Sequence, residues 1–446
     1  MVPMAEIAPL TPLRYDLEQL KDSGGLASIV APPYDVIDAE QRAQLAARHP
    51  NNIVRLILPE GDDESRYITA NVLYKSWRRE GVLIRDEEPA FYRYDQTFAP
   101  PGGGPAKTRR GFLGLVKLVA LNQKIVLPHE RTLSGPKMDR LKLFRATRTN
   151  FSPGFMLYRD PKKELDSALA EANVLAEFKT PDGISHALAK ITKRDALKAI
   201  VDGVAKSSLL IADGHHRYET AFRYMEETTS TGTDRPEHFF FLVFFANGDD
   251  PDLVVFPTHR HVHSLPSFDF GELSSRARNL FDVMPLPPGA NAKVYTDELE
   301  KAGKNGPALV ACAGDGRAAL FTLKADADLA GHPILGSRVE ALRKTDVALL
   351  HMGILEPILG ITPEMQAAKS NIWYPQDAAA ALDALRKGGE KGGQALFLMN
   401  GTPVAQVRAV AEAGEVMPQK STFFYPKVAT GLCIHTLEPD RQVPTV

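Results

Sequence analysis

Five consecutive residues combine a carboxylate, a glycine, two imidazoles and a guanidinium, and together they form the strongest candidate site in the sequence. These residues, called the DGHHR turn below, are Asp213, Gly214, His215, His216 and Arg217. An apolar run that suits a buried strand precedes the turn, and apolar residues at helical spacing follow it. Glycine permits a tight turn, and the first N–H groups of a helix favour anions. The pattern therefore predicts an anion site between a strand and a helix.

The side chains of the DGHHR turn suit phosphate chemistry. Arg217, in the first helical turn, offers a bidentate fork to a phosphate. His215 and His216 can donate hydrogen bonds or move protons. Asp213, at the carboxyl end of the strand, would hold Mg²⁺ or polarise a hydroxyl. In the plainer alternative, Asp213 caps the helix and the histidines only fill the turn.

A second cluster combines His129 and Glu130 with two downstream cations, Lys137 and Arg140. A carboxylate just past a strand, followed by a basic helix start, suits a general base beside a phosphate-binding pair. The alternative is a solvated charged helix in which Glu130 forms a surface salt bridge.

A third cluster places Lys420, Ser421, Thr422 and Lys427 near one another in the sequence. Lysine followed by a hydroxyl residue is typical of phosphate loops, but the upstream glycines of a Walker A motif are absent. The cluster therefore predicts a looser phosphate contact.

Two further groups are weaker. One group is three alternating histidines, His259, His261 and His263, which would all point to one face of a strand. They would either bind a metal or simply belong to a partly exposed strand. The other group is three cations, Lys107, Arg109 and Arg110, which are too few for a nucleic-acid-binding patch.

The composition narrows the class of protein. The chain has 446 residues, 44% hydrophobic and 24% charged, as expected for a globular protein. Its 53 Lys+Arg against 55 Asp+Glu give a net charge of −2, which makes nucleic acid an unlikely partner. Two isolated cysteines, Cys312 and Cys433, argue against a disulfide framework and a cysteine zinc site. With no signal peptide and no apolar run of about 20 residues, we expect a cytoplasmic protein without a membrane partner.

The pattern of apolar and turn residues predicts an α+β protein with a mixed sheet. Helices are expected at 39–49, 64–80, 136–147, 163–177, 184–204 and from 218, and strands at 52–58, 90–98, 111–119, 208–212 and 238–246. The loop at 100–104 is either a hairpin connection or a domain boundary.

Several separated motifs in a fixed order resemble a bacterial and archaeal family of unknown function. They occupy residues 31–37, 128–140, 213–218, 257–260 and 417–422. At Gln419 the usual family form has a second proline, a mild departure. The DGHHR turn also resembles the signature of the ParB/sulfiredoxin-like superfamily, in which free-serine kinases carry an Asp-Gly-His-His-Arg form.

This resemblance implies a ParB/sulfiredoxin-like core at 105–265, between an N-terminal segment at 1–104 and a C-terminal α+β segment at 266–446. It also implies a phosphotransferase that uses Mg²⁺ with ATP, ADP or pyrophosphate and takes a small hydroxyl substrate, L-serine above all. Glu130 is the candidate for the glutamate base of those kinases. Cations that would offset phosphate charge are Lys137, Arg140 and Lys420, and residues expected to line the cleft are Tyr34, Asp35 and His129. A nucleotide-binding regulatory module and a metal-dependent phosphohydrolase remain alternatives.

Overall fold

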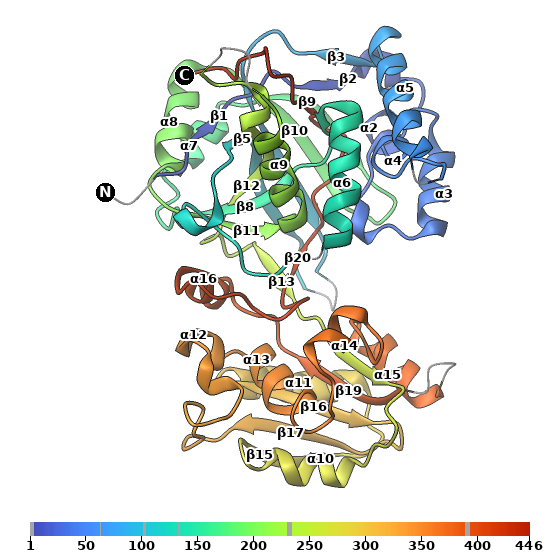
Figure 1. Cartoon of the computed structure of the whole chain (residues 1–446), viewed down its shortest axis with the longest axis vertical. Helices are drawn as coiled ribbons and strands as arrows, with labels where there is room; N and C mark the ends of the chain where they lie inside the picture. Colours follow the sequence, from blue (N-terminus) through green and yellow to red (C-terminus); the bar gives the residue numbers. More distant parts are fainter. Residues whose placement is uncertain (1–3, 63, 101–103, 133, 230–233, 389–392) are drawn as a thin grey trace. The chain divides into compact units, whose positions relative to one another are not determined.

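A computed structural model describes the chain except for residues 1–3, 63, 101–103, 133, 230–233 and 389–392. The contacts divide the chain into two compact units (Figure 1). Unit 1 contains residues 1–128, 132–253 and 426–446, and unit 2 contains residues 129–131 and 254–425. The sequence predicts three consecutive segments instead. The difference arises because the segment at 1–104 shares one sheet with the predicted core.

Unit 1 is built on a nine-stranded mixed sheet. The strand order is β6 (Val126–Leu127), β11 (Leu209–Asp213), β8 (Gly154–Tyr158), β12 (Phe240–Asn247), β5 (Lys107–Lys117), β4 (Phe91–Phe98), β10 (Ser185–Ile191) and β9 (Asn173–Lys179), with β1 (Ile7–Ala8) paired to β5. The pairs β6–β11 and β8–β12 are parallel, and the other pairs are antiparallel. This mixed sheet, together with the helices of the unit, confirms the predicted α+β class.

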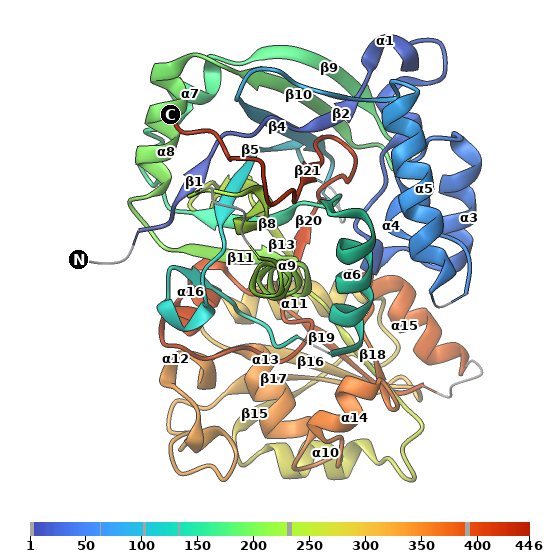
Figure 2. The same cartoon turned by 45° about the horizontal axis from the view of Figure 1, so that its top comes forward.

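The helices of unit 1 are mostly short. They are α1 (Leu17–Leu20), α2 (Gly25–Ile29), α3 (Ala39–Arg48), α4 (Val54–Ile57), α5 (Ser65–Arg79), α6 (Ser134–Thr147), α7 (Asp166–Ala170), α8 (Arg194–Val204) and α9 (His215–Glu227), with 3-10 turns η1 (Tyr34–Val36), η2 (Leu121–Gln123) and η3 (Glu237–Phe239). Two small strand pairs add β2 (Leu13–Tyr15) with β3 (Leu83–Arg85), and β7 (Thr149–Asn150) with β21 (His435–Thr436). Helices α6 and α9 lie side by side (Figure 2).

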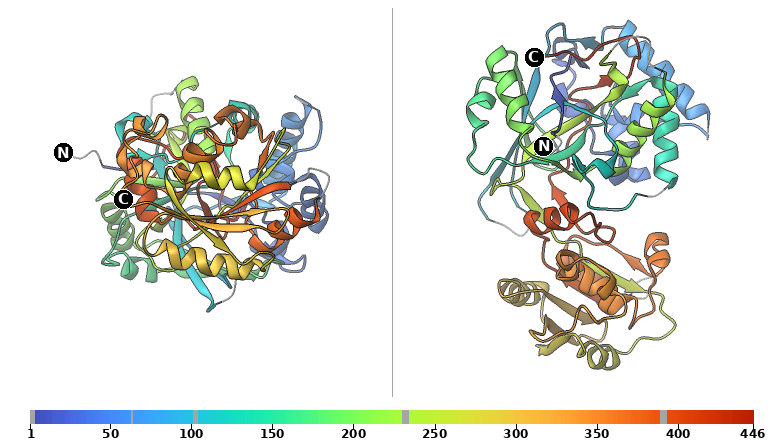
Figure 3. Two further views of the ribbon diagram at one scale, coloured as in Figure 1. Left: turned by 90° about the horizontal axis from the view of Figure 1, so that it is seen from below. Right: turned by 60° about the vertical axis from the view of Figure 1, so that its left-hand side comes forward.

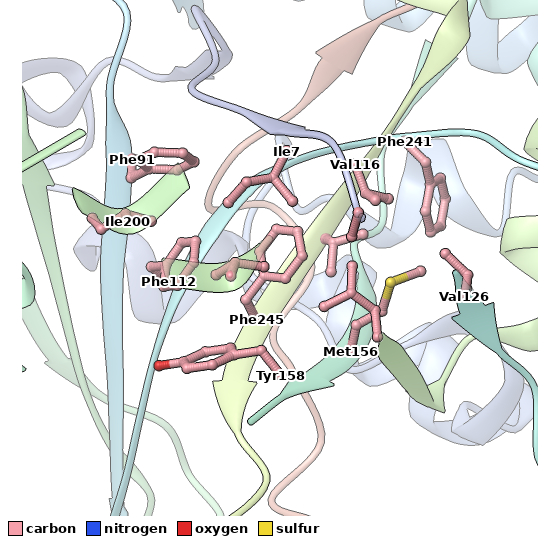
Figure 4. Packing of buried hydrophobic residues seen from close by; sticks show 14 of the residues in the cluster. Ile7, Phe91, Phe112, Val116, Val126, Met156, Tyr158, Ile200, Phe241 and Phe245 are labelled. Carbon is pink, nitrogen blue, oxygen red and sulfur yellow. The ribbon is translucent and has the colours of Figure 1, made fainter. Parts of the chain in front are cut away.

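Aromatic side chains pack against one another, one pair edge-to-face and one pair stacked, at the centre of the unit 1 sheet. Phe112 lies between Phe91 and Phe245, with ring centroids 5.2 and 5.1 Å apart (Figure 4). All three rings are fully buried. Burying rings of this size contributes much of the free energy of folding, so the central strands form a rigid platform from which β11 carries the DGHHR turn.

Unit 2 is built on a six-stranded antiparallel sheet (Figure 3). The order is β15 (Phe281–Leu286), β17 (Ala318–Leu323), β16 (Ala308–Ala313), β19 (Gly393–Met399), β14 (Arg260–His263) and β18 (Ile372–Trp373). A separate pair joins β13 (Val254–Phe256) and β20 (Phe423–Tyr425). The helices are α10 (Phe270–Ala277), α11 (Ala292–Gly303), α12 (Glu340–Arg343), α13 (Asp346–Leu350), α14 (Pro363–Ala368), α15 (Ala378–Lys387) and α16 (Val404–Glu412), with a 3-10 turn η4 (Leu335–Ser337) and a π-helical turn η5 (His351–Leu355).

Several predicted elements are confirmed. Asp38 caps α3 with a full capping box to Gln41, and α5 ends before Gly81, whose φ is 76°. Strands β4 and β5 pair as an antiparallel hairpin, so the loop at 100–104 is a connection within one sheet, although residues 101–103 lie outside the described residues. Over the part of the chain that the structure describes, no helix has the length and apolar character needed to span a membrane.

Two predictions of secondary structure are wrong. The β-branched run at 52–58 forms the short helix α4, because the Asn52 side chain accepts the N–H of Val54 at 2.9 Å and starts a helical turn. The helices predicted over 163–177 and 184–204 include strands β9 and β10, which pair with each other and extend the sheet beyond β4. A local side-chain bond therefore decides the first case, and pairing within the sheet overrides the local pattern in the second.

Candidate functional site

The DGHHR turn joins β11 to α9 through a left-handed glycine. Gly214 has φ 92° and ψ 28° and occupies the N-cap position of α9. A Cβ at this position would lie 3.0 Å from the guanidinium carbon of Arg217, so both the conformation and the space favour glycine. Gly214 has no side chain with which to cap α9, and Asp213 lies one residue before it, at the end of β11.

Asp213 is held between two cations. Arg217 Nη2 donates to Oδ2 at 2.5 Å, and Lys427 Nζ donates to Oδ1 at 2.9 Å. Burial would raise the pKa of Asp213, but Lys427 and Arg217, with a smaller contribution from His215, outweigh it and hold the pKa of this carboxyl well below its usual range. Asp213 is therefore a fixed carboxylate at neutral pH.

Arg217 is sealed into the protein. Its side chain is 5% exposed, and besides the bond to Asp213 it donates from Nη1 to the carbonyl of Pro153. The sequence predicts a guanidinium that forks onto a phosphate. In the structure both terminal nitrogens already have protein acceptors. Arg217 therefore fixes the position of Asp213 and contributes a buried positive charge to the site.

Tyr34 and Arg140 belong to the same charged neighbourhood of unit 1. The guanidinium carbon of Arg140 lies 4.2 Å from the centre of the Tyr34 ring, and Arg140 Nη1 donates to the carbonyl of Ile57 at 2.6 Å. Burial raises the pKa of Tyr34, while the charges of Arg140 and Arg217 oppose that rise. The motif at 31–37, the basic start of α6 and the DGHHR turn therefore meet in one region. Asp35 also acts electrostatically on the Tyr34 hydroxyl.

Lys137 has a different set of partners. Its ammonium donates to Glu219 at 2.8 Å and to the Thr132 hydroxyl at 2.9 Å. Both Lys137 and Glu219 line a cavity of about 620 Å³, whose apolar lining includes Leu121 and Phe222. The backbone carbonyl of His216, within the DGHHR turn, accepts a hydrogen bond from the Thr220 hydroxyl at 2.7 Å.

A second group of predicted residues comes together in unit 2. Glu130 accepts the N–H of Ser421 at 3.1 Å, and His129 Nε2 lies 2.9 Å from the Thr422 hydroxyl. Glu130 also forms a parallel bridge to Met417, so the segment 129–131 lies along the 417–422 loop. The sequence separates these residues by almost 300 positions, and the structure joins them in one cluster.

Arg260 connects the parts of this cluster, although its sequence context alone predicts no role for it. Its side chain is buried and donates from Nε to His351 at 3.1 Å and from Nη2 to the carbonyl of Lys420 at 3.1 Å. The bond to Lys420 supports a left-handed residue, because Lys420 has φ 58°. The Pro-Thr-His-Arg run at 257–260 is the only signal in the sequence that marks this arginine.

Mg²⁺ does not fit the surroundings of Asp213. Both carboxylate oxygens already accept from cations, and hard cations need free oxygen ligands. The described residues contain no group of three or more His, Cys, Asp or Glu side chains that would hold a metal ion. A magnesium ion at Asp213 would therefore lack a free carboxylate oxygen, and among the described residues His259, His261 and His263 form no such group.

Comparison with solved structures finds similar chains at low identity. A free serine kinase mutant in complex with ADP is 11% identical with a TM-score of 0.37, covering 70% of this chain and 89% of that chain. A conserved hypothetical protein from Pyrococcus furiosus is 13% identical with a TM-score of 0.33, covering 69% and 92%. SbnI with a C-terminal truncation from Staphylococcus aureus is 11% identical with a TM-score of 0.31, covering 72% and 87%. Similarity at this level carries no argument about function.

No curated protein matches the chain. Residues 7–348, more than half of the sequence, match a family described as "Protein of unknown function (DUF1015)". The match spans the motif at 31–37, the 128–140 cluster, the DGHHR turn and the run at 257–260. The chain belongs to the DUF1015 family.

Proposed function

We propose that this protein transfers a phosphoryl group from a nucleotide or pyrophosphate to a small hydroxyl compound, and that free L-serine is the acceptor. One observation carries the proposal: two cations, Arg217 and Lys427, share the single carboxylate of Asp213 at the N-terminal end of α9. The cluster therefore has a net positive charge where the helix also favours anions. L-serine follows from the resemblance of the DGHHR turn to that of free-serine kinases.

The chemistry needs positioning and charge neutralisation more than covalent catalysis. The serine hydroxyl oxygen forms a bond to the terminal phosphorus of the donor, and the bond from that phosphorus to the bridging oxygen breaks. We assign the hydroxyl proton to the carboxylate of Glu130, which accepts one N–H in unit 2. Lys427 and Arg217 offset the negative charge of the phosphates.

Purified full-length protein tests the proposal when incubated with L-serine and, in turn, ATP, ADP or pyrophosphate. O-phosphoserine, detected by phosphorus NMR and mass spectrometry, is expected with at least one donor. Absence of O-phosphoserine with all three donors, with and without Mg²⁺, would overturn the proposal.

One observation favours a second candidate, a nucleotide-binding module without chemistry. Both oxygens of Asp213 and both terminal nitrogens of Arg217 are engaged inside the protein, which suits a rigid binding surface. Glu130→Gln separates the candidates. In a kinase it abolishes turnover and spares nucleotide binding, whereas in a binding module there is no turnover to lose. Glu415→Gln, which alters another partly buried carboxylate of unit 2, is the matched control.

A further inference from the structure

A second buried arginine in unit 1 lacks the partners that its charge requires. Arg109, on β5, is 2% exposed. Its Nη2 donates to the side-chain oxygen of Gln96, but Nε and Nη1 have no hydrogen-bond partner in the described part of the chain. The rings of Phe155 and Phe244 lie 4.7 and 5.3 Å from its guanidinium carbon. Aromatic faces attract a cation, yet they accept no ordinary hydrogen bond from these N–H groups.

Arg109 stays charged in this setting. Burial lowers the pKa of Arg109 to about 10, and the neighbouring Tyr94 and Asp213 oppose that shift. At neutral pH the guanidinium is therefore protonated. A buried charge without a counter-ion costs free energy, and groups of this kind gather at functional sites.

Hydrogen bonds connect Arg109 to the DGHHR turn. Gln96, which accepts from Arg109, donates from Nε2 to the backbone carbonyl of Lys427 at 3.0 Å. Lys427 in turn donates to Asp213, which also accepts from Arg217. Three cations, Arg109, Lys427 and Arg217, thus lie along one connected network with the Asp213 carboxylate.

The network reaches the surface at one end. Lys427 and Asp213 keep 18% and 19% of their side-chain surface exposed, whereas Arg109 and Arg217 are sealed. A small molecule that approaches Asp213 and Lys427 comes close to a carboxylate that two cations, Lys427 and Arg217, share. The missing partner of the network is therefore an anion.

We propose that Arg109 completes an oxyanion subsite, in which a carboxylate or phosphate oxygen of a bound small molecule accepts hydrogen bonds from Arg109 Nε and Nη1. Which small molecule binds in this subsite rests on the proposed function. The subsite deepens that function because it requires the bound reactant to carry an anionic group beside Asp213. Two reactants supply such a group, the carboxylate of L-serine and the phosphates of the donor.

Binding measurements on the full chain test the subsite without any need for turnover. We would titrate wild type with L-serine, with L-serinamide, which lacks the carboxylate, and with pyrophosphate, and follow heat and melting temperature. Saturable binding of L-serine but not L-serinamide assigns the subsite to the acceptor, and binding of pyrophosphate assigns it to the donor. No saturable binding of L-serine or pyrophosphate to wild type would overturn the proposal.

Arg109→Met removes the charge and keeps much of the volume, and Arg110→Met is the matched control. Arg110 is the next residue on β5, lies 46% exposed and faces Asp95. We expect Arg109→Met to weaken the assigned anion at least tenfold and Arg110→Met to leave it unchanged. Equal binding by wild type and a folded Arg109→Met would overturn the proposal. If Arg109→Met fails to fold, Arg109→Lys, which keeps the charge with fewer donors, takes its place under the same criterion.

The outcome also separates this inference from the proposed function. Anion binding that depends on Arg109, without any O-phosphoserine, keeps the subsite and overturns the kinase proposal. O-phosphoserine formation by Arg109→Met at the wild-type kcat/KM keeps the kinase and overturns the subsite.

Discussion

Lys427 and Asp213 lie 214 residues apart in the chain, yet Lys427 Nζ donates to Asp213 Oδ1 across 2.9 Å. This bond fixes the residues from 426 onward to the strand that carries the DGHHR turn. Because Arg217 takes the other oxygen, the carboxylate is bound from two sides. The position of Asp213 therefore depends both on α9 and on the C-terminal segment of unit 1.

Replacing Lys427 by methionine should destabilise the protein. Asp213 would lose one of its two cationic partners in a partly buried site, which costs about 2 kcal/mol for a hydrogen bond to a charged group. Chemical denaturation measures the loss. Lys198→Met is the matched control, because Lys198 is 68% exposed in a surface pair with Asp202 and should change stability by less than about 0.5 kcal/mol. Equal effects of the two variants would contradict the arrangement.

The depressed pKa of Asp213 predicts an acid-sensitive contribution to stability. The folded pKa lies below the value of about 3.9 in the unfolded chain. Below pH 4 the unfolded state therefore binds more protons than the folded state, so stability falls as the pH falls toward the folded pKa. Above that window the contribution is complete and constant. Asp213→Asn, compared with wild type by denaturation at pH 3 to 7, should be less stable at neutral pH and lose part of the acid slope. Parallel profiles would contradict the prediction.

Gly214→Ala should destabilise the turn and displace Arg217. The added methyl would meet the guanidinium at 3.0 Å in a backbone conformation with φ 92°. Left-handed strain costs about 1 kcal/mol or more before any displacement. Gly135→Ala is the control, since Gly135 lies in α6 with no neighbour within 4 Å of an added Cβ. There alanine should change stability by less than about 0.5 kcal/mol, because Gly135 lies in the first turn and precedes Pro136. Thermal unfolding of both variants gives the comparison, and a stabilised Gly214→Ala would contradict it.

Lys420→Gly should separate stability from function. Lys420 has φ 58°, so glycine should relieve backbone strain worth up to about 1 kcal/mol. If the ammonium offsets phosphate charge, phosphotransfer should fall about tenfold or more despite the gain in stability. Lys369→Gly is a close control, because Lys369 has φ 55° at the end of α14 and no proposed role. It should gain stability and keep full activity. Unchanged phosphotransfer by Lys420→Gly would remove Lys420 from the proposal.

The sequence predicts local features well. The capping box at Asp38, the glycine stop after α5 and the β4–β5 hairpin all follow from interactions between residues that are close in the chain. Such interactions operate before any tertiary contact forms, which is why the pattern alone is sufficient for them.

Features that depend on distant partners are not predictable in this way. On α5 the apolar pattern puts Ile68 and Val72 on the inner face, but they are 65% and 62% exposed, while Tyr67 and Tyr74 are buried. Strands β9 and β10 form because each pairs with a neighbour in the sheet. The need of Arg109 for a counter-charge is visible only once its burial is known, since an arginine in a strand usually faces water.

The division of unit 1 has a consequence for the order of synthesis. Residues 426–446 belong to unit 1 but emerge from the ribosome only after all of residues 254–425 have been made. Domains generally fold as units while the chain is still growing. The DGHHR turn therefore remains incomplete, with Asp213 lacking one of its two cations, until residues 254–425 have been translated. A nascent chain halted at residue 425 would carry every strand of the nine-stranded sheet and still lack Lys427 to complete the charge balance.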